Sequence, residues 1–152
     1  MKEKGLQNNF AEKLTKVEPF ALGLTLFGFV AQIQNWDKLP VAGILILGAS
    51  SLALLYFLKA QFYVDVNWRA ADRNSHRVLF IGLSIGLIAF LFHIENWPKW
   101  EPLMFVCMLA MCIGFLGIVM RKGSLLRYMN TIELSSLLLV MIYFIRIFWG
   151  NL

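Results

Sequence analysis

Two stretches of the chain end in the same way. Residues 26–40 read LFGFVAQIQNWDKLP, and residues 87–98 read LIAFLFHIENWP. Each closes an apolar run on Ile-x-Asn-Trp, and a lysine and a proline follow within a few residues. An apolar run of about 20 residues is long enough to cross a bilayer as a helix. The two stretches therefore predict transmembrane helices that each end in a turn.

The rest of the chain continues this pattern. Of the 152 residues, 59% are hydrophobic and 15% are charged, with a mean hydropathy of +0.68, whereas soluble domains carry about 25% charged residues. We therefore predict an all-α integral membrane bundle of about five transmembrane helices, with two tandem helical hairpins and a C-terminal helix. The predicted spans are 19–36, 41–58, 78–94, 103–120 and 132–149.

The predicted spans divide the chain into six segments. A polar segment precedes the first span and no cleavage site follows it, so this span is not a signal peptide. The predicted organisation is a cytoplasmic amphipathic segment (1–17), a first transmembrane hairpin (18–58), a cytoplasmic loop (59–77), a second hairpin (78–120), a second cytoplasmic loop (121–131) and a fifth transmembrane helix (132–152).

Charge distribution predicts the orientation. Eleven of the 14 Lys and Arg residues lie before the first span or in the second and fourth loops, which share one side. The positive-inside rule places that side, with the N-terminus, in the cytoplasm and the C-terminus outside. This distribution also explains the net charge of +5, so we expect no nucleic-acid partner. The outer ends carry interfacial tryptophans, as anchoring in the headgroup layer requires: Trp36, Trp97, Trp100 and Trp149.

Two cytoplasmic segments have patterns of their own. Four apolar side chains recur at helical spacing before the first span: Leu6, Phe10, Leu14 and Val17. They predict a short helix on the inner membrane surface, which Pro19 ends. The second loop alternates apolar and polar positions, at Phe62, Val64, Val66 and Trp68, which leaves its secondary structure open. Asp72 and His76 follow at a spacing that allows a bond on one helix face.

The two hairpins form an internal repeat. A shift of 61 residues superposes Leu22 on Leu83, Asn35-Trp36 on Asn96-Trp97 and Lys38 on Lys99. Both copies start inside and turn outside, so the repeat is parallel, and the fifth span has no counterpart. At each turn Trp anchors the helix end, Asn can bond free carbonyls, and Pro suits the first turn of the returning helix. A structural hairpin needs no more than this.

These segments resemble the transmembrane hairpin of the gliding-motility protein L family, which belongs to the inner-membrane motor of type IX secretion. Members of that family carry an apolar helix, a Lys-Ile-Gln-His-Trp-Pro-Gly-like turn and a second apolar helix. This chain has Gln32 and His93 where the family has an intramembrane lysine, and Asn35 and Asn96 where it has the turn histidine. The family's glutamate falls near Leu52. The resemblance thus implies a hairpin architecture in a bacterial inner membrane rather than motor activity.

Polar residues within the spans are the candidate functional residues, because burying them is costly. Gln32 and Gln34 match His93 and Glu95 in the repeat, and side-by-side hairpins would gather the four into a polar cluster below the outer face. Interhelical bonding and a proton or ligand site both explain such a cluster. We expect Gln32 and His93 to face the interior, and Gln34 or Glu95 to reach water. Arg146 lies one turn from the outer end and can snorkel.

No metal, nucleotide or hydrolase motif occurs in the sequence, and we expect no cofactor. Small residues on the third and fourth spans predict close helix packing, at Gly82, Gly86, Ala110 and Gly114. We therefore predict a non-enzymatic subunit or scaffold of an inner-membrane complex. It would act through helix association in lipid, as a homo-oligomer or with a membrane-protein partner. The alternatives are an oligomeric ion or proton pore, a membrane-disrupting effector, or an intramembrane enzyme that uses His93 and Glu95.

Overall fold

The computed structural model describes residues 2–34, 36, 40–62, 70–120 and 129–150. It contains the helices α1 (Lys2–Ile33), α2 (Val41–Phe62), α3 (Ala70–Ile94), α4 (Trp100–Val119) and α6 (Thr131–Gly150). The described residues form no strand, and the prediction of an all-α bundle with five helices is confirmed.

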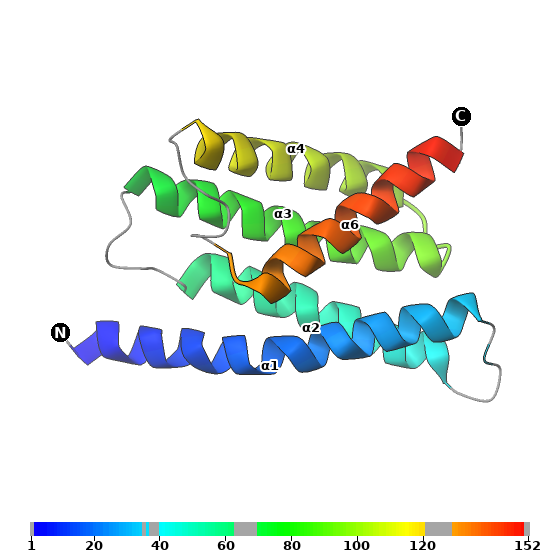
Figure 1. Cartoon of the computed structure of the whole chain (residues 1–152), viewed down its shortest axis with the longest axis horizontal. Coiled ribbons are helices and arrows are strands. Elements are labelled where there is room, and N and C mark those ends of the chain that lie inside the picture. Colours follow the sequence, from blue (N-terminus) through cyan, green and yellow to red (C-terminus); the bar gives the residue numbers. More distant parts are fainter. Residues whose placement is uncertain (1, 35, 37–39, 63–69, 121–128, 151–152) are drawn as a thin grey trace.

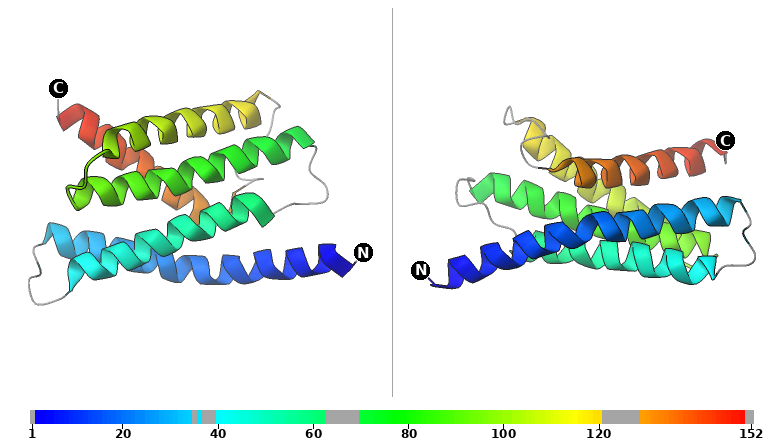
Figure 2. Two further views of the ribbon diagram at one scale, coloured as in Figure 1. Left: turned by 180° about the vertical axis from the view of Figure 1, so that it is seen from behind. Right: turned by 60° about the horizontal axis from the view of Figure 1, so that its bottom comes forward.

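The helices form two hairpins and one crossing helix (Figure 1). The α1–α2 and α3–α4 hairpins lie side by side with both turns at the same end of the bundle, and α6 crosses them obliquely (Figures 1 and 2). The most extensive packing occurs within each hairpin and between α2 and α3, whereas α6 contacts α3 and α1 more sparsely. We call the two ends of the bundle the turn end and the loop end.

Four helices are long and apolar enough to cross a membrane, over Lys13–Gln32, Val41–Phe62, Arg73–Ile94 and Trp100–Val119. The chain is therefore a multi-pass membrane protein. Helix α6 has 20 residues and lies where the fifth span is expected, and its passage through the membrane stays a prediction.

The first helix differs from the expectation. The prediction that Pro19 ends a separate surface helix is wrong, because α1 continues through Pro19 as one helix of 32 residues. Proline removes one backbone N–H donor from a helix, but peptide groups in an apolar environment have no water to bond and favour a continuous helix. In the second loop, Phe62 ends α2, and Val64, Val66 and Trp68 lie outside the described residues.

Glycines set the spacing within both hairpins. A Cβ on Gly48 of α2 would lie 2.6 Å from the backbone nitrogen of Thr25, and one on Gly114 of α4 would lie 2.9 Å from that of Leu79. Real side chains do not approach so closely, so only glycine allows these backbones to touch. The small-residue packing predicted for the third and fourth spans is therefore confirmed at Gly114.

Candidate functional site: a buried charged cluster

Three charged side chains from three helices meet inside the bundle. Lys59 of α2 donates hydrogen bonds to Glu18 Oε2 of α1 and, at 2.6 Å, to Glu133 Oε1 of α6. The exposed fractions are 0% for Glu18, 1% for Lys59 and 6% for Glu133. Buried charges are tolerated only when they are paired and hydrogen-bonded. We refer to Glu18, Lys59 and Glu133 as the charged cluster.

The start of α6 positions the third member of this cluster. Asn130 Oδ1 accepts the backbone N–H of Glu133 at 2.8 Å, and Glu133 Oε2 accepts the backbone N–H of Asn130 at 2.8 Å. This reciprocal pair is a capping box, which satisfies two N–H groups that the first helical turn leaves free. The Asn130 amide also donates to Glu18 Oε2 at 3.3 Å. The helix cap thereby fixes α6 against α1.

A second polar contact joins α2 to α6 beside the charged cluster. The hydroxyl of Tyr56, one turn before Lys59, donates to Ser136 Oγ at 2.5 Å, and Ser136 donates to the carbonyl of Ile132 at 3.0 Å. The Tyr56 ring lies edge-on to Phe80 of α3, with 5.5 Å between centroids. Helix α6 is therefore held at its first two turns by bonds to α1 and α2.

The sequence pattern does not reveal these residues, for identifiable reasons. Lys59 was assigned to the second loop and counted as a cytoplasmic charge, but α2 continues to Phe62 and buries it. Glu133 falls at the start of the predicted fifth span, and Lys59 and Asn130 bind it. One signal was available, because Asn130 and Glu133 have the spacing of a capping box. The contacts of Lys59 join residues 41 and 74 positions apart, which periodicity does not reveal.

The polar residues predicted near the turn end do not bond to one another in the described part of the chain. His93 Nδ1 instead lies 2.6 Å from the hydroxyl of Tyr143 on α6. Gln32 and Glu95 are half-buried, each with a side-chain oxygen that has no hydrogen-bond partner, and Gln34 is exposed. The repeat alone predicted one cluster. The non-repeated α6 supplies the partner of His93, so the four residues form no single network.

The repeated Asn-Trp pair forms a helix end. Just beyond the end of α3, Asn96 has φ 54° and its N–H donates to the His93 carbonyl at 3.2 Å. The Trp97 N–H donates to the Phe92 carbonyl at 2.7 Å. These two bonds define a Schellman motif. The carbonyls thus accept from backbone N–H groups, whereas the sequence suggested an asparagine side chain.

The first copy of the turn has the same principal bond. The Trp36 N–H donates to the Ala31 carbonyl at 3.1 Å, and Asn35 lies outside the described residues. Both tryptophan rings pack on a phenylalanine of the preceding helix, Trp36 on Phe27 at 6.0 Å and Trp97 on Phe92 at 5.1 Å between centroids. The Ile-x-Asn-Trp repeat is therefore accounted for by helix termination and ring packing.

Two other predicted residues have ordinary surroundings. Arg146 is exposed on α6 and lines a groove between α1 and α6 with Leu22 and Tyr143. His76 is buried and its ring stacks on Phe80, with 4.3 Å between centroids. The side chain of Asp72, its expected partner, lies outside the described residues.

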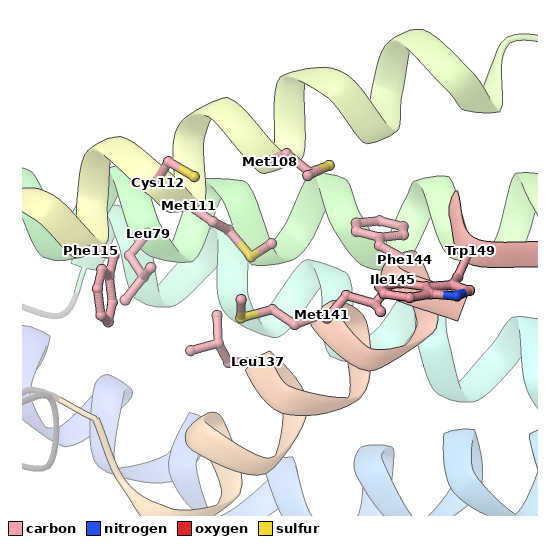
Figure 3. Close-up of a pocket in the computed structure, with 10 residues that line it drawn as sticks. All are labelled: Leu79, Met108, Met111, Cys112, Phe115, Leu137, Met141, Phe144, Ile145 and Trp149. Carbon is pink, nitrogen blue, oxygen red and sulfur yellow. The ribbon is translucent and has the colours of Figure 1, made fainter. Parts of the chain in front are cut away.

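An apolar groove lies between α4 and α6 (Figure 3). Its volume is about 440 Å³. Side chains from α4 and α6 point into it, and Leu79 of α3 lies between them (Figure 3). The other lining residues are Met108, Met111, Cys112, Phe115, Leu137, Met141, Phe144, Ile145 and Trp149. We call this surface the α4–α6 groove.

Comparisons with protein-family models, with characterised proteins and with solved structures find no match. The resemblance to the gliding-motility protein L hairpin therefore rests on the quoted residues alone.

Proposed function

We propose that the protein is a non-enzymatic subunit or scaffold of a membrane complex, and that a transmembrane helix of a partner occupies the α4–α6 groove. The single observation that carries this proposal is the groove itself. It is lined by apolar residues only and opens between two helices that make little contact with each other.

The uneven burial of the spans supports this proposal. Within the four candidate spans, 56% of the α3 window is buried but only 28% of the α4 window. Helix α4 thus presents a largely apolar surface, with Phe105, Ile113 and Leu116 each more than half exposed. Lipid chains can cover such a surface. Association between helices in a bilayer instead depends on close packing, because lipid is as apolar as the side chains. The side chains that line the α4–α6 groove offer a partner helix such close packing.

The pore and enzyme alternatives have less support. The pore relied on a cluster of Gln32, Gln34, His93 and Glu95 together with Arg146, and the enzyme relied on His93 and Glu95. In the described part of the chain the residues of this cluster do not bond to one another. The scaffold proposal needs no such network, because its contact surface is apolar.

The proposed setting is a bacterial inner membrane with the N-terminus in the cytoplasm, the C-terminus outside and α6 as the fifth span. The distribution of Lys and Arg supports this orientation. The shared position of the two turns supports the hairpin architecture implied by the family resemblance (Figure 1). Reporters active on one side only, fused at either end of the chain, test the topology. Opposite signals are expected, and equal signals would rule out an odd number of spans.

Site-specific photocrosslinking in intact membranes tests the occupant of the groove. A benzophenone side chain is placed at Phe115, which lines the groove and is 42% exposed. The matched control places it at Phe57 of α2, which is 46% exposed and lies outside the groove. We expect a discrete protein adduct at position 115 and lipid adducts alone at position 57.

The identity of the partner follows from the same experiment. Two copies of the chain with different tags are co-expressed. Adducts that carry both tags identify a homo-oligomer, and adducts that never carry both tags identify a different protein. Filling the groove with Leu137→Trp should abolish the adduct. Lipid adducts alone at position 115, or equal protein adducts at both positions, would contradict the proposal.

A further inference from the structure

We propose that a second groove, between α1 and α6, binds an anionic phospholipid, with the acyl chains along the groove and the phosphate on Arg146. This site is separate from the α4–α6 groove and does not depend on what occupies that groove. It rests on one element of the proposed function, the passage of α6 through the membrane as the fifth span.

Apolar side chains from two helices form the walls of this second groove. Its volume is about 440 Å³, and its walls include Leu22 and Leu26 of α1 and Leu138 and Ile142 of α6. The two helices make few contacts with each other, and Leu26, Leu138 and Ile142 are exposed. The walls are therefore open to the acyl chains of the bilayer. We call this surface, with Arg146 at its end, the α1–α6 groove.

A positive charge distinguishes the α1–α6 groove from the α4–α6 groove, whose lining is apolar throughout. Arg146 is the last residue of α6 that lines the α1–α6 groove, and the C-terminal part of α6 lies at the turn end (Figure 1). The side chain of Arg146 is exposed, and no carboxylate among the described residues forms an ion pair with it. A guanidinium group binds phosphate through two parallel N–H donors. The end of the groove therefore suits a phosphate group.

The depth of Arg146 matches that of a lipid headgroup. Trp149 follows three residues later, about 4.5 Å along the helix, and its exposed ring is of the kind that gathers at headgroup level. Arg146 lies 11 positions after Ser135, the first residue of α6 that lines the groove. This distance is about 16 Å along the helix, or roughly half of the 30 Å hydrocarbon core. The α1–α6 groove thus extends over the depth of one leaflet, as the acyl chains of one phospholipid do.

Charge also decides between the possible occupants. A partner helix would leave the guanidinium group without a counter-charge unless it carried an acidic residue at that depth, and such residues are rare in spans. An anionic phospholipid brings the counter-charge with its headgroup. A zwitterionic headgroup would place its own cation beside Arg146. We therefore expect anionic phospholipid to be preferred about fivefold, the effect of one Lys or Arg near a membrane surface.

Photolabelling of the full chain in lipid nanodiscs tests the site. The nanodiscs consist of phosphatidylcholine with a trace of a probe, either phosphatidylglycerol or phosphatidylcholine with a diazirine in one acyl chain. Peptide mass spectrometry locates the adducts. The anionic probe should label α6 between Leu138 and Ile142 about fivefold more than the zwitterionic probe. At Leu54, an exposed residue of α2 outside both grooves, the two probes should label equally.

Substitutions separate a specific contact from the general charge of the turn end. Arg146→Gln should remove the preference for the anionic probe. Lys99→Gln removes an exposed cation of the same end outside the groove and should leave the preference unchanged. Leu138→Trp fills the groove with Arg146 still in place and should also remove the preference. Equal losses in Arg146→Gln and Lys99→Gln, or a full preference in Leu138→Trp, would overturn the proposal.

Failure of the site and failure of the fifth span give different results. Equal labelling of α6 by the two probes would overturn the lipid site alone, because α6 would still contact acyl chains. No labelling of α6 by either probe would overturn both the span and the site. A benzophenone side chain at Ile142 in intact membranes should give lipid adducts. A discrete protein adduct at that position would show that a helix occupies the α1–α6 groove, which would overturn the proposal.

Discussion

The two ends of the bundle are held together in different ways. At the turn end, backbone hydrogen bonds close the first helix of each hairpin. The Trp97 N–H donates to the Phe92 carbonyl, and the Trp36 N–H donates to the Ala31 carbonyl. At the loop end, Glu18, Lys59 and Glu133 connect three helices through residues far apart in the sequence. The turn end is repeated along the chain, and the loop end occurs once.

This difference separates architecture from specialised chemistry. The Ile-x-Asn-Trp motif recurs because each hairpin needs the same helix end. Helix termination and ring packing account for it fully. The charged cluster is costly to bury. It joins α1 to α2 within the first hairpin and also joins both of these helices to α6. The region of the molecule that sequence repetition emphasises is therefore not the region with the candidate functional side chains.

The largest expected effect lies at the loop end. Lys59→Met leaves two buried carboxyl groups without their cation and should lower the free energy of unfolding by about 3–5 kcal/mol. Thermal unfolding in detergent measures the change. Lys99→Met, at an exposed position of the turn end, is the control and should change little. Equal effects of the two substitutions would remove the distinction between the ends.

A smaller effect on stability is expected between the two ends, where glycine sets the spacing of the helices within each hairpin. Gly114→Ala places a Cβ 2.9 Å from the backbone and side chain of Leu79 and should cost about 1–3 kcal/mol through overpacking. Gly43→Ala is the control, since nothing lies within 4 Å of its Cβ, and alanine should stabilise that helix by about 0.5–1 kcal/mol. Unfolding of both variants under the same conditions decides the matter, and a stabilised Gly114→Ala would contradict the close approach.

The cap of α6 should contribute about 1 kcal/mol to the free energy of unfolding. Asn130→Ala removes the side chain that bonds Glu133 N–H and Glu18 Oε2, and loss of a helix cap costs about 0.5–2 kcal/mol. Ser135→Ala, an exposed serine that bonds only within its own helix, is the comparison. We expect a lower unfolding midpoint for Asn130→Ala alone. If Ser135→Ala lowered the unfolding midpoint as much as Asn130→Ala, the cap would not anchor α6.

The smallest effect is expected at the turn end. Asn96 has a left-handed backbone conformation, which glycine adopts without cost and alanine adopts at about 1 kcal/mol. Asn96→Gly should therefore unfold like the wild-type protein and Asn96→Ala slightly earlier. The same unfolding midpoint for Asn96→Ala and Asn96→Gly would show that the left-handed backbone conformation does not restrict which residue can occupy position 96.

These regions also differ in how far the sequence predicts them. Apolar runs of membrane-spanning length predicted the five helices, and the end of α3 at Ile94 and start of α2 at Val41 agree with the structure. Pro19 misled, because a local helix-breaking preference is overridden where the backbone has no water to bond. The charged cluster could not be predicted, since Glu18 and Glu133 meet Lys59 only after three helices have packed. A capping-box spacing at Asn130 was the one local signal.

A double-mutant cycle between Lys59 and Glu133 tests most directly whether the charged cluster acts as one unit across helices. Lys59→Met and Glu133→Gln each leave an unpaired partner, whereas the double variant removes both charges together. We predict that the double variant loses about 1–3 kcal/mol less stability than the sum of the single variants, as coupled residues do. Additive losses within about 0.3 kcal/mol, as found for distant and independent sites, would contradict the account.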